Sequence, residues 1–341
     1  MNRNFNVLFI GLGSIGQRHL RNIKKLLSSK VNFFAYRKTR HVPLLNNRGD
    51  KIKGKIEKKY NVSLVDNLNS INQSNTDIVF ITNPSSHHIS SVLKLKNLKN
   101  AYIFIEKPID SSLKNYSKFS QFIKKNNINV FIGYNVRFHP GYIKLKKILS
   151  NRSVFKNIHY TIFKCGKNLE DYHNYEDYRI SYAARNKLGG GICLTGVHEL
   201  DMMLNLFGNA KLLKSHADKI SNLKIDVEDF SLSFYKHNFF KRKVLSLIVL
   251  DFIQRSEERY IKIIGDKGEI FLDLVNYYLK ISKKNKTKVF KFNKNKNLMY
   301  LDELKVFLKF FKKRKKITKE YNEINAFKSL KLAIQIKKNF S

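Results

Sequence analysis

The sequence predicts an α/β protein in two parts: a doubly wound parallel sheet, then an α+β domain with a large, mostly antiparallel open sheet. In the first third of the chain, short apolar runs alternate with segments of helical periodicity, which is typical of a parallel sheet. Later, strand-like runs follow one another through short connections, which is typical of an antiparallel sheet. With 341 residues, 43% of them hydrophobic, the chain can fill two cores. We place the two domains at 1–125 and 126–341.

The first strand is expected at Val7–Ile10, a continuous apolar run that fits a strand buried on both faces. A helix is expected at Ile15–Leu27, where apolar residues recur at helical spacing. The alternation continues with strands at 31–36, 62–65, 78–82, 102–105 and 130–132, and with helices at 51–60, 86–98 and 112–125. Strands and helices that alternate in this way are joined by right-handed crossovers.

The second part is expected to contain strands at 158–163, 230–235, 244–250, 260–264 and 269–272. A turn at Gly265–Gly268 separates the last two and predicts a hairpin. Two helices, at 298–313 and 323–338, are expected to complete the chain.

The net charge of +40 results from 66 Lys and Arg residues against 26 Asp and Glu residues. The lysines are spread along the whole chain, and Asn, Ile, Phe and Tyr are also abundant, as in an AT-rich coding sequence. We therefore expect a solvated basic surface and no specific nucleic-acid partner. The alternative is a protein that binds a polyanion, such as a nucleic acid or a membrane surface.

Cys165 and Cys193 are too few for a disulfide framework or a zinc site, and we expect no metal. No signal-peptide pattern precedes the first strand. The densest apolar run, Val244–Leu250, has the length of a strand and falls short of the ~18 residues that a membrane span needs. We expect a cytoplasmic protein with no membrane insertion.

A glycine-rich turn follows the first strand and opens the first helix. Its pattern is GxGxxG, and in this context it predicts a Rossmann dinucleotide-binding domain. The first glycine permits a tight turn, the second lets the backbone approach a pyrophosphate, and the third lets the helix pack on the sheet. The phosphates would lie on the free N–H groups at the helix N-terminus. We expect the cofactor NAD(P) to be bound by Gly11, Gly13, Ser14, Ile15 and Gly16.

The end of the second strand bears on the choice between NAD and NADP. An acidic residue about twenty positions after the motif would bind the ribose diol of NAD. That position holds Tyr36, followed by Arg37 and Lys38. Arg37 is a candidate for the 2′-phosphate of NADP, so the sequence favours NADP; alternatively, both residues are two more of many basic side chains.

Polar residues follow the fourth and fifth strands, where a parallel sheet binds its ligands. Thr82, Asn83, Pro84 and His88 follow the fourth strand, and Glu106 and Lys107 follow the fifth. We expect all six to border the cofactor; for His88 the alternative is a helix cap. Lys107 can also polarise a sugar hydroxyl, unless it is an ordinary surface lysine before a turn.

A third candidate region begins at Gly189–Gly191 and continues into an expected helix that ends at Gly208. His198 lies in its first turns. A histidine titrates near physiological pH, so His198 can take a hydroxyl proton as a hydride leaves. The alternative is a core histidine bonded to a backbone carbonyl.

Six motifs occur in order along the chain: GLGSIGQRHLRN at 11–22, TNPSSHH at 82–88, EKPID at 106–110, GYNVRFHP at 133–140, DYRISYAA at 177–184 and GGGICLTGVHELDMMLNLFG at 189–208. Their combination resembles the glucose–fructose oxidoreductase, inositol dehydrogenase and rhizopine-catabolism (Gfo/Idh/MocA) family over nearly the whole chain. The resemblance implies catalytic roles for Lys107 and His198. It also implies a large sheet that packs face to face in homodimers or homotetramers. Leu194 stands where many members carry Asp, so the family's Lys–Asp–His set is incomplete here.

The run with Tyr178, Arg179 and Tyr182 looks like the branch that accompanies surface-polysaccharide and nucleotide-sugar biosynthesis. By this resemblance the substrate is a sugar or nucleotide sugar, bound by Asn135, Arg137, Tyr182, Thr195 and His198. For Asn135 and Arg137 the alternative is an interdomain hydrogen-bond pair. The expected activity is hydride transfer between NAD(P) and a secondary alcohol or ketone carbon. Its competitors are a non-catalytic nucleotide-binding protein and the polyanion-binding protein.

Overall fold

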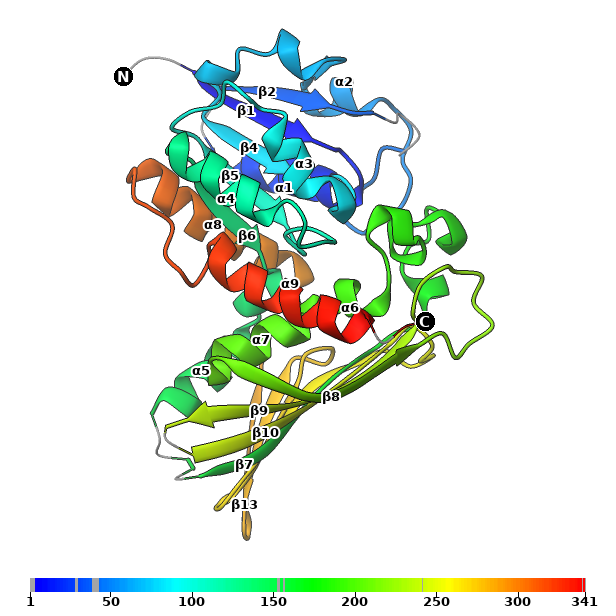
Figure 1. Ribbon diagram of the computed structural model, residues 1–341, viewed down its shortest axis with the longest axis vertical. Coiled ribbons are helices and arrows are strands. Elements are labelled where there is room, and N and C mark those ends of the chain that lie inside the picture. Colours follow the sequence, from blue (N-terminus) through cyan, green and yellow to red (C-terminus); the bar gives the residue numbers. More distant parts are fainter. Residues whose placement is uncertain are drawn as a thin grey trace.

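The structure is a computed structural model that describes residues 4–27, 30–38, 43–151, 154–155, 157–240, 242–338 and 340. Two sheets organise these residues, and a layer of helices lies between them (Figure 1). The predicted fold class is confirmed: a parallel Rossmann sheet precedes a mixed, mostly antiparallel sheet.

The first sheet has the strand order β3-β2-β1-β4-β5-β6, and its strands all pair in parallel. Its central strands are buried on both faces, as the apolar runs predict. The chain order reverses between β1 and β4, so a ligand-binding crevice is expected there. The strands are β1 (Phe5–Ile10), β2 (Val31–Tyr36), β3 (Ser63–Val65), β4 (Ile78–Ile81), β5 (Tyr102–Glu106) and β6 (Asn129–Gly133). The helices are α1 (Ser14–Leu26), α2 (Ile56–Tyr60), α3 (His88–Leu93) and α4 (Tyr116–Lys125).

The second sheet has the order β14-β13-β12-β11-β7-β10-β9-β8. Its strands are β7 (Ile158–Gly166), β8 (Ala210–Asp218), β9 (Phe230–Phe239), β10 (Arg242–Asp251), β11 (Glu258–Gly265), β12 (Gly268–Asp273), β13 (Tyr278–Lys283) and β14 (Lys286–Lys291). Neighbouring strands pair antiparallel except β7 and β10, which pair in parallel.

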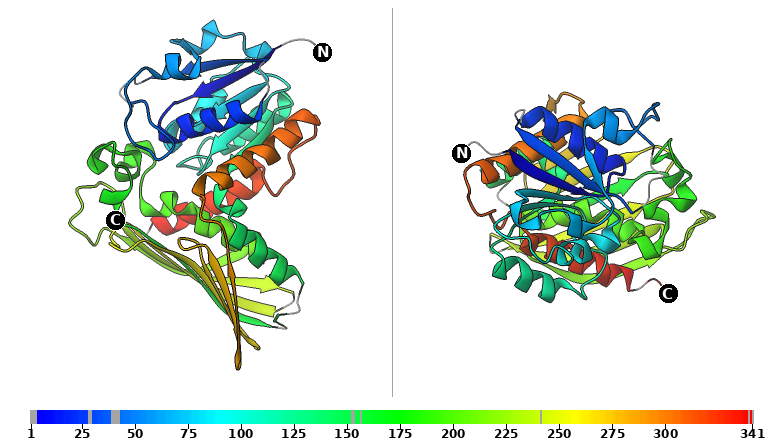
Figure 2. Two further views of the ribbon diagram at one scale, coloured as in Figure 1. Left: turned by 180° about the vertical axis from the view of Figure 1, so that it is seen from behind. Right: turned by 90° about the horizontal axis from the view of Figure 1, so that it is seen from above.

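Helices cover one face of this sheet and leave the other face open (Figure 2). The covering helices are α5 (Pro140–Ser150), α6 (Ile192–Thr195), α7 (Val197–Phe207) and α9 (Glu323–Lys337). Side chains alternate along β10 accordingly: Val244 and Ile248 are buried, whereas Leu245 between them is 36% exposed.

The chain returns to the first domain near its end. Helix α8 (Lys296–Lys312) packs against α1, and its Phe307 ring lies edge-on to Phe80, Phe104 and Phe131 at centroid distances of 5.9, 5.6 and 5.6 Å. Strand β6 also belongs to the first sheet, although it follows residue 125. The first domain therefore extends past the expected boundary and includes α8, because its aromatic core takes side chains from both ends of the chain.

Candidate active site

A cavity of about 1060 Å³ lies between the two domains, at the carboxyl ends of the central parallel strands. The first domain lines it with the glycine turn, the ends of β2, β4 and β5, and the start of α3. The second domain lines it with α6, α7, β7, β11 and the segment from 171 to 188. Predicted site residues on its wall are Gly11, Gly13, Ser14, Ile15, Arg37, Thr82, Asn83, Pro84, His88, Glu106, Lys107, Asn135, Tyr182, Thr195 and His198.

The glycine turn has the shape that its sequence predicts. Gly11 has a φ of +94°, and a Cβ there would lie 2.7 Å from the backbone nitrogen of Asn83. A Cβ at Gly16 would lie 2.7 Å from the oxygen of Gly11, so Gly16 packs behind the turn and does not line the cavity. Gly13, by contrast, has no neighbouring atom within 4 Å of its Cβ position. The turn is therefore tightly packed at Gly11 and Gly16 and open at Gly13.

The open side fits a dinucleotide phosphate. Helix α1 begins at Ser14 with no side-chain cap, so the N–H groups of its first turn are available to an anion. Asn83 lies beside them; its Nδ2 donates to Ser91 at 2.9 Å, while its buried Oδ1 has no partner among the described residues. Free donors, a free acceptor and the space above Gly13 together fit the expected cofactor.

The adenosine end of this crevice has cations and one acidic side chain that the sequence pattern did not indicate. Arg37 and Lys38 line the cavity just after β2, as expected. Arg48 and Asp50, from the loop that follows, line it as well. Asn46 donates to Asp50 at 2.9 Å and holds that loop in place. Sequence reasoning missed Asp50 because it comes from a loop and not from the strand end.

His88 has less freedom to meet a ligand than expected. Its Nδ1 lies 2.8 Å from the backbone oxygen of Pro108, and its Nε2 lies 2.8 Å from that of Asn83. Burial lowers the pKa of this imidazole. His88 therefore links the segments that follow β4 and β5, while its edge still lines the cavity.

Lys107 and His198 come together where the domains meet. The Nζ of Lys107 donates to the backbone oxygen of Thr195 at 3.0 Å, three residues before His198. Burial lowers the pKa of Lys107. Burial and then the positive charges of Lys107, Arg259 and Arg137 lower the pKa of His198 well below its ordinary value. This direction favours the neutral imidazole, because two domains enclose it beside cations.

Two polar atoms in this corner have no partner among the described residues: His198 Nδ1 and Thr195 Oγ1, both buried. Buried polar atoms are almost always hydrogen-bonded, so an unpartnered pair beside a cavity points to a ligand that supplies the bonds. A hydroxylated ligand would satisfy both.

A further cation, Arg259 on β11, was missed by sequence reasoning. Its Nε donates to Glu199 Oε1 at 2.6 Å and its Nη2 to Oε2 at 3.1 Å. Glu199 directly follows His198, so this bidentate pair fixes α7 to the sheet. The two residues are 60 positions apart, and no local motif joins them.

The carboxylate of Glu106 is held by a side chain of α1 and by a backbone N–H group. His19 Nε2 lies 2.5 Å from its Oε1, and the backbone N–H of Lys107 donates to its Oε2 at 3.2 Å. The peptide bond between Lys107 and Pro108 is cis. His19 belongs to the glycine-turn motif on α1, so that helix and the lysine segment are directly joined.

Arg137 does not line the cavity, although Asn135 and Tyr182 do. Its buried guanidinium donates to both carboxylate oxygens of Asp201 on α7, at 2.6 and 2.5 Å, and to the backbone oxygen of Glu320. These contacts favour, for Arg137, the interdomain hydrogen-bond role that was the alternative to a contact with substrate.

Residues 5–134 match the family model described as oxidoreductase family, NAD-binding Rossmann fold (GFO_IDH_MocA). Over these residues the chain is similar to the NAD-binding domain of the Gfo/Idh/MocA family. A curated relative, the myo-inositol 2-dehydrogenase of Thermotoga maritima, is 29% identical over 147 residues. That alignment covers 43% of this chain and 41% of the relative, so the match spans less than half of the relative's length.

Solved structures share the fold of the whole chain. The UDP-N-acetylglucosamine 3-dehydrogenase of Acidithiobacillus ferrooxidans has a TM-score of 0.74 at 15% identity, over 99% of this chain and 98% of that one. GenD2 from gentamicin A biosynthesis, solved in complex with NAD, has a TM-score of 0.76 at 13% identity, over 99% and 95%. The chain thus has a two-domain fold that these solved structures share.

Two further observations concern what the described residues do not contain. Their helices include none long and apolar enough to cross a membrane. Their His, Cys, Asp and Glu side chains form no group of three or more that could hold a metal ion.

Proposed function

We propose that this protein is an NAD(P)-dependent oxidoreductase that interconverts a secondary alcohol and a ketone on a sugar or nucleotide sugar. One observation carries the proposal: Lys107 and His198, from different domains, meet on the wall of the cavity that also contains the open glycine turn. When bound, the nicotinamide would supply the hydride acceptor or donor.

The residues of the first domain would bind the cofactor. Backbone N–H groups after Gly13 would hold the pyrophosphate, with Ser14 and Ile15 at the same helix start. Asn83 offers its unpartnered Oδ1, and Thr82 supports the turn because its Oγ1 donates to the oxygen of Gly11 at 2.7 Å. Glu106 and the cis Lys107–Pro108 segment would form the floor near the reacting carbon.

Lys107 and His198 would share the proton chemistry. The neutral imidazole of His198 can accept the hydroxyl proton at a ring nitrogen during oxidation. The Nζ of Lys107, fixed by the Thr195 oxygen, would donate to the same substrate oxygen and stabilise charge that develops on it. Burial and the neighbouring cations oppose protonation of His198, so the proton should pass on quickly to solvent.

The substrate class rests on two supports. The segment with Tyr178, Arg179 and Tyr182 looks like that of the branch for polysaccharide and nucleotide-sugar biosynthesis, and Tyr182 lines the cavity. A solved UDP-N-acetylglucosamine 3-dehydrogenase also shares the fold. Asn135, Tyr182 and Thr195 would contact sugar hydroxyls, since all three line the cavity that also contains Lys107 and His198.

We further propose NADP as the preferred cofactor, because Arg37 and Lys38 line the adenosine end and β2 ends without an acidic residue. The test is a fluorescence titration of the protein with NADPH and NADH. Arg37→Ala should weaken NADPH binding by about tenfold and NADH binding little, since only NADPH carries the extra phosphate. Asp50→Asn tests the alternative, in which this carboxylate binds the ribose diol of NAD. If Asp50→Asn weakens NADH binding and Arg37→Ala leaves NADPH binding unchanged, the cofactor is NAD.

Absence of binding by either cofactor at moderate salt would reject the oxidoreductase proposal and favour a polyanion-binding protein. Binding without turnover on any sugar would instead favour a non-catalytic nucleotide-binding protein. The buried Leu194, which occupies the family's usual Asp position, motivates that second outcome.

We also propose that the protein is a homodimer or homotetramer assembled through the open face of the second sheet. Tyr160 and Leu245 are paired on neighbouring strands and are 43% and 36% exposed, and Leu232 on β9 is 38% exposed. A second copy of the same sheet would cover this apolar face.

A further inference from the structure

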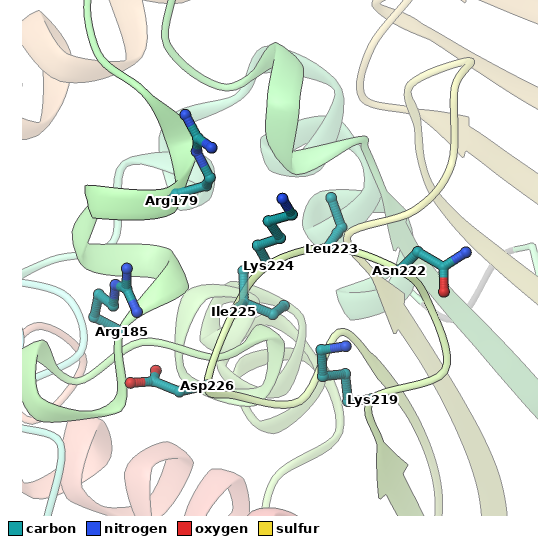
Figure 3. A pocket seen from close by; sticks show the side chains of 8 residues that line it. All are labelled: Arg179, Arg185, Lys219, Asn222, Leu223, Lys224, Ile225 and Asp226. Atoms are coloured by element: carbon teal, nitrogen blue, oxygen red, sulfur yellow. The ribbon is translucent and has the colours of Figure 1, made fainter.

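A second, basic pocket lies on the outside of the substrate domain. It has a volume of about 590 Å³ and is formed by two segments: 179–185, and the loop at 219–226 between β8 and β9 (Figure 3). Four of its lining side chains are cations: Arg179, Arg185, Lys219 and Lys224. We call it the outer basic pocket. The proposed function assigns no role to it.

Hydrogen bonds hold the two walls of the outer basic pocket together. The backbone N–H of Lys224 donates to the hydroxyl of Tyr178 at 3.3 Å. The carboxylate of Asp226 accepts from the backbone of Asn186 at 2.7 Å, and its own N–H donates to the oxygen of Ala184 at 3.3 Å. The pocket is therefore a fixed part of the fold and not a gap between loose loops.

The far end of the loop is fixed as well. Asp229 is fully buried, and its carboxylate accepts from the backbone N–H groups of Ile220 and Ser221 at 2.9 and 3.2 Å. With both ends tied, the loop presents its lysines from a constant position.

The charges inside the pocket are not balanced by its acids. Arg179 donates to Asp177 through Nε and Nη2, which orients its guanidinium. Asp226 is already bonded to Asn186. No hydrogen bond or ion pair from the Arg185 guanidinium or the Lys224 ammonium to another described residue is found, and Figure 3 shows both bordering the same space as Arg179. An anion placed there would gain charge-assisted bonds from two segments at once.

The lining side chains also indicate what kind of anion fits. None of them is aromatic, so the pocket offers no surface on which a nucleobase could stack. Several donors around a compact space match a phosphate or diphosphate group, which arginine binds with its planar fork. This favours a small phosphorylated molecule over a nucleic-acid strand.

The outer basic pocket shares a wall with the cleft. Arg179 and Arg185 line the pocket, whereas Ile180, Tyr182 and Leu188, from the same segment, line the cavity of the candidate active site. Ile180, which follows Arg179 directly in the chain, is 66% exposed. A ligand in the pocket would thus contact the same segment that borders the proposed substrate.

We propose that the outer basic pocket is a binding site for a diphosphate group, held by Arg179, Arg185 and Lys224. Two sources share this chemistry. One is the diphosphate of a nucleotide sugar whose ring lies in the cleft, a source that rests on the proposed function. The other is a separate phosphorylated effector that binds in the outer basic pocket, next to the segment that lines the active-site cavity.

The test is a calorimetric titration with inorganic pyrophosphate in about 150 mM salt, which weakens non-specific attraction to so basic a protein. NADPH is present so that the glycine turn is occupied. The test variant is the double substitution Arg185→Gln and Lys224→Gln. The control is Lys187→Gln with Lys267→Gln, which removes the same net charge from exposed lysines that do not line the pocket.

We expect the test variant to lose at least about tenfold in pyrophosphate affinity, and the control to stay within about twofold of the unmodified protein. Equal losses in both variants, or no saturable binding to the unmodified protein, would overturn the proposal. Competition then separates the sources. Displacement of pyrophosphate by UDP-N-acetylglucosamine but not by N-acetylglucosamine assigns the site to the substrate, and simultaneous binding assigns it to an effector. Failure of both NADPH and NADH to bind would reject the proposed function alone, because comparing the pyrophosphate affinities of the test and control variants requires neither cofactor.

Discussion

Lys107 is joined to Thr195 across the two domains: its Nζ donates to the threonine's backbone oxygen at 3.0 Å. Thr195 is the last residue of α6, and α7, which carries His198, begins two residues later. The bond therefore sets where the lysine lies relative to the histidine, although one belongs to the segment after β5 and the other to the substrate domain.

Lys107→Met should lower turnover by about 10²–10⁴-fold, the usual contribution of a positioned proton donor or acceptor. NADPH affinity should change little, because the pyrophosphate contacts lie at the glycine turn. Steady-state rates on whichever sugar supports turnover, together with a cofactor titration, measure both effects. Lys267→Met, in the turn between β11 and β12, is the control. Full activity in Lys107→Met would remove the lysine from the mechanism.

Gly13→Val should impair cofactor binding, whereas Gly16→Ala should lower the stability of the fold. Gly13 has open space at its Cβ position and an ordinary negative φ, so valine should fold normally but block the pyrophosphate. A Cβ at Gly16 meets the oxygen of Gly11 at 2.7 Å and Thr82 Oγ1 at 2.8 Å, so alanine should lower the free energy of unfolding by about 1–3 kcal/mol. Urea unfolding and cofactor titration separate the two. Undiminished cofactor binding by Gly13→Val would place the dinucleotide elsewhere.

Stability should fall as the pH drops from about 6.5 to 4. Burial lowers the pKa of both His139 and His237 to about 4, so between these values the unfolded chain binds protons that the folded chain does not. Each such histidine makes the free energy of unfolding decrease by up to about 1.4 kcal/mol per unit as the pH falls. His139 also caps α5, since its Nδ1 accepts from the backbone of Gly141 at 3.1 Å.

His139→Asn keeps a capping side chain but removes the titrating group. The slope of the free energy of unfolding against pH should then decrease by the contribution of nearly one bound proton, while the other buried histidines keep the slope positive. Urea unfolding at several pH values measures this slope. An unchanged slope would mean that His139 is protonated in the folded protein as readily as in the unfolded chain.

Leu245→Lys should lower the oligomer size, because it places a charge in the middle of the open sheet face, beside Tyr160. Ile143→Lys is the matched control: Ile143 is 51% exposed on α5, in the layer of helices on the other face. Light scattering after size-exclusion chromatography gives the masses. A monomeric unmodified protein, or an equal effect of both substitutions, would contradict assembly through this face.

Much of the fold could be predicted because the central parallel strands are continuous apolar runs, as at Ile78–Ile81. The strands missed were β8, β13 and β14, at or near the edges of the second sheet. In β14, for example, lysines are interspersed with Thr, Val and Phe, and five of its six residues are exposed. Such a pattern resembles a polar loop, since an edge strand has little apolar surface to bury.

The site could be predicted where a local motif carries it, as at the glycine turn, Lys107 and His198. Contacts between segments that are far apart in the sequence could not be predicted. The pairing of Arg259 with Glu199 and of Arg137 with Asp201 depends on the way the second domain folds back on the first. From the sequence alone, Arg137 could be either a substrate ligand or part of an interdomain hydrogen-bond pair, and Arg259 was one basic residue among many.

The position of Phe307 among Phe80, Phe104 and Phe131 has a consequence for synthesis on the ribosome. Domains of a nascent chain commonly fold in order, starting from the N-terminus. Here the first domain's aromatic core lacks a ring until about three hundred residues have been made, so its earliest strands must wait, partly packed, for a helix translated long after them. During that interval, the exposed phenylalanine faces are the surface on which a chaperone would act.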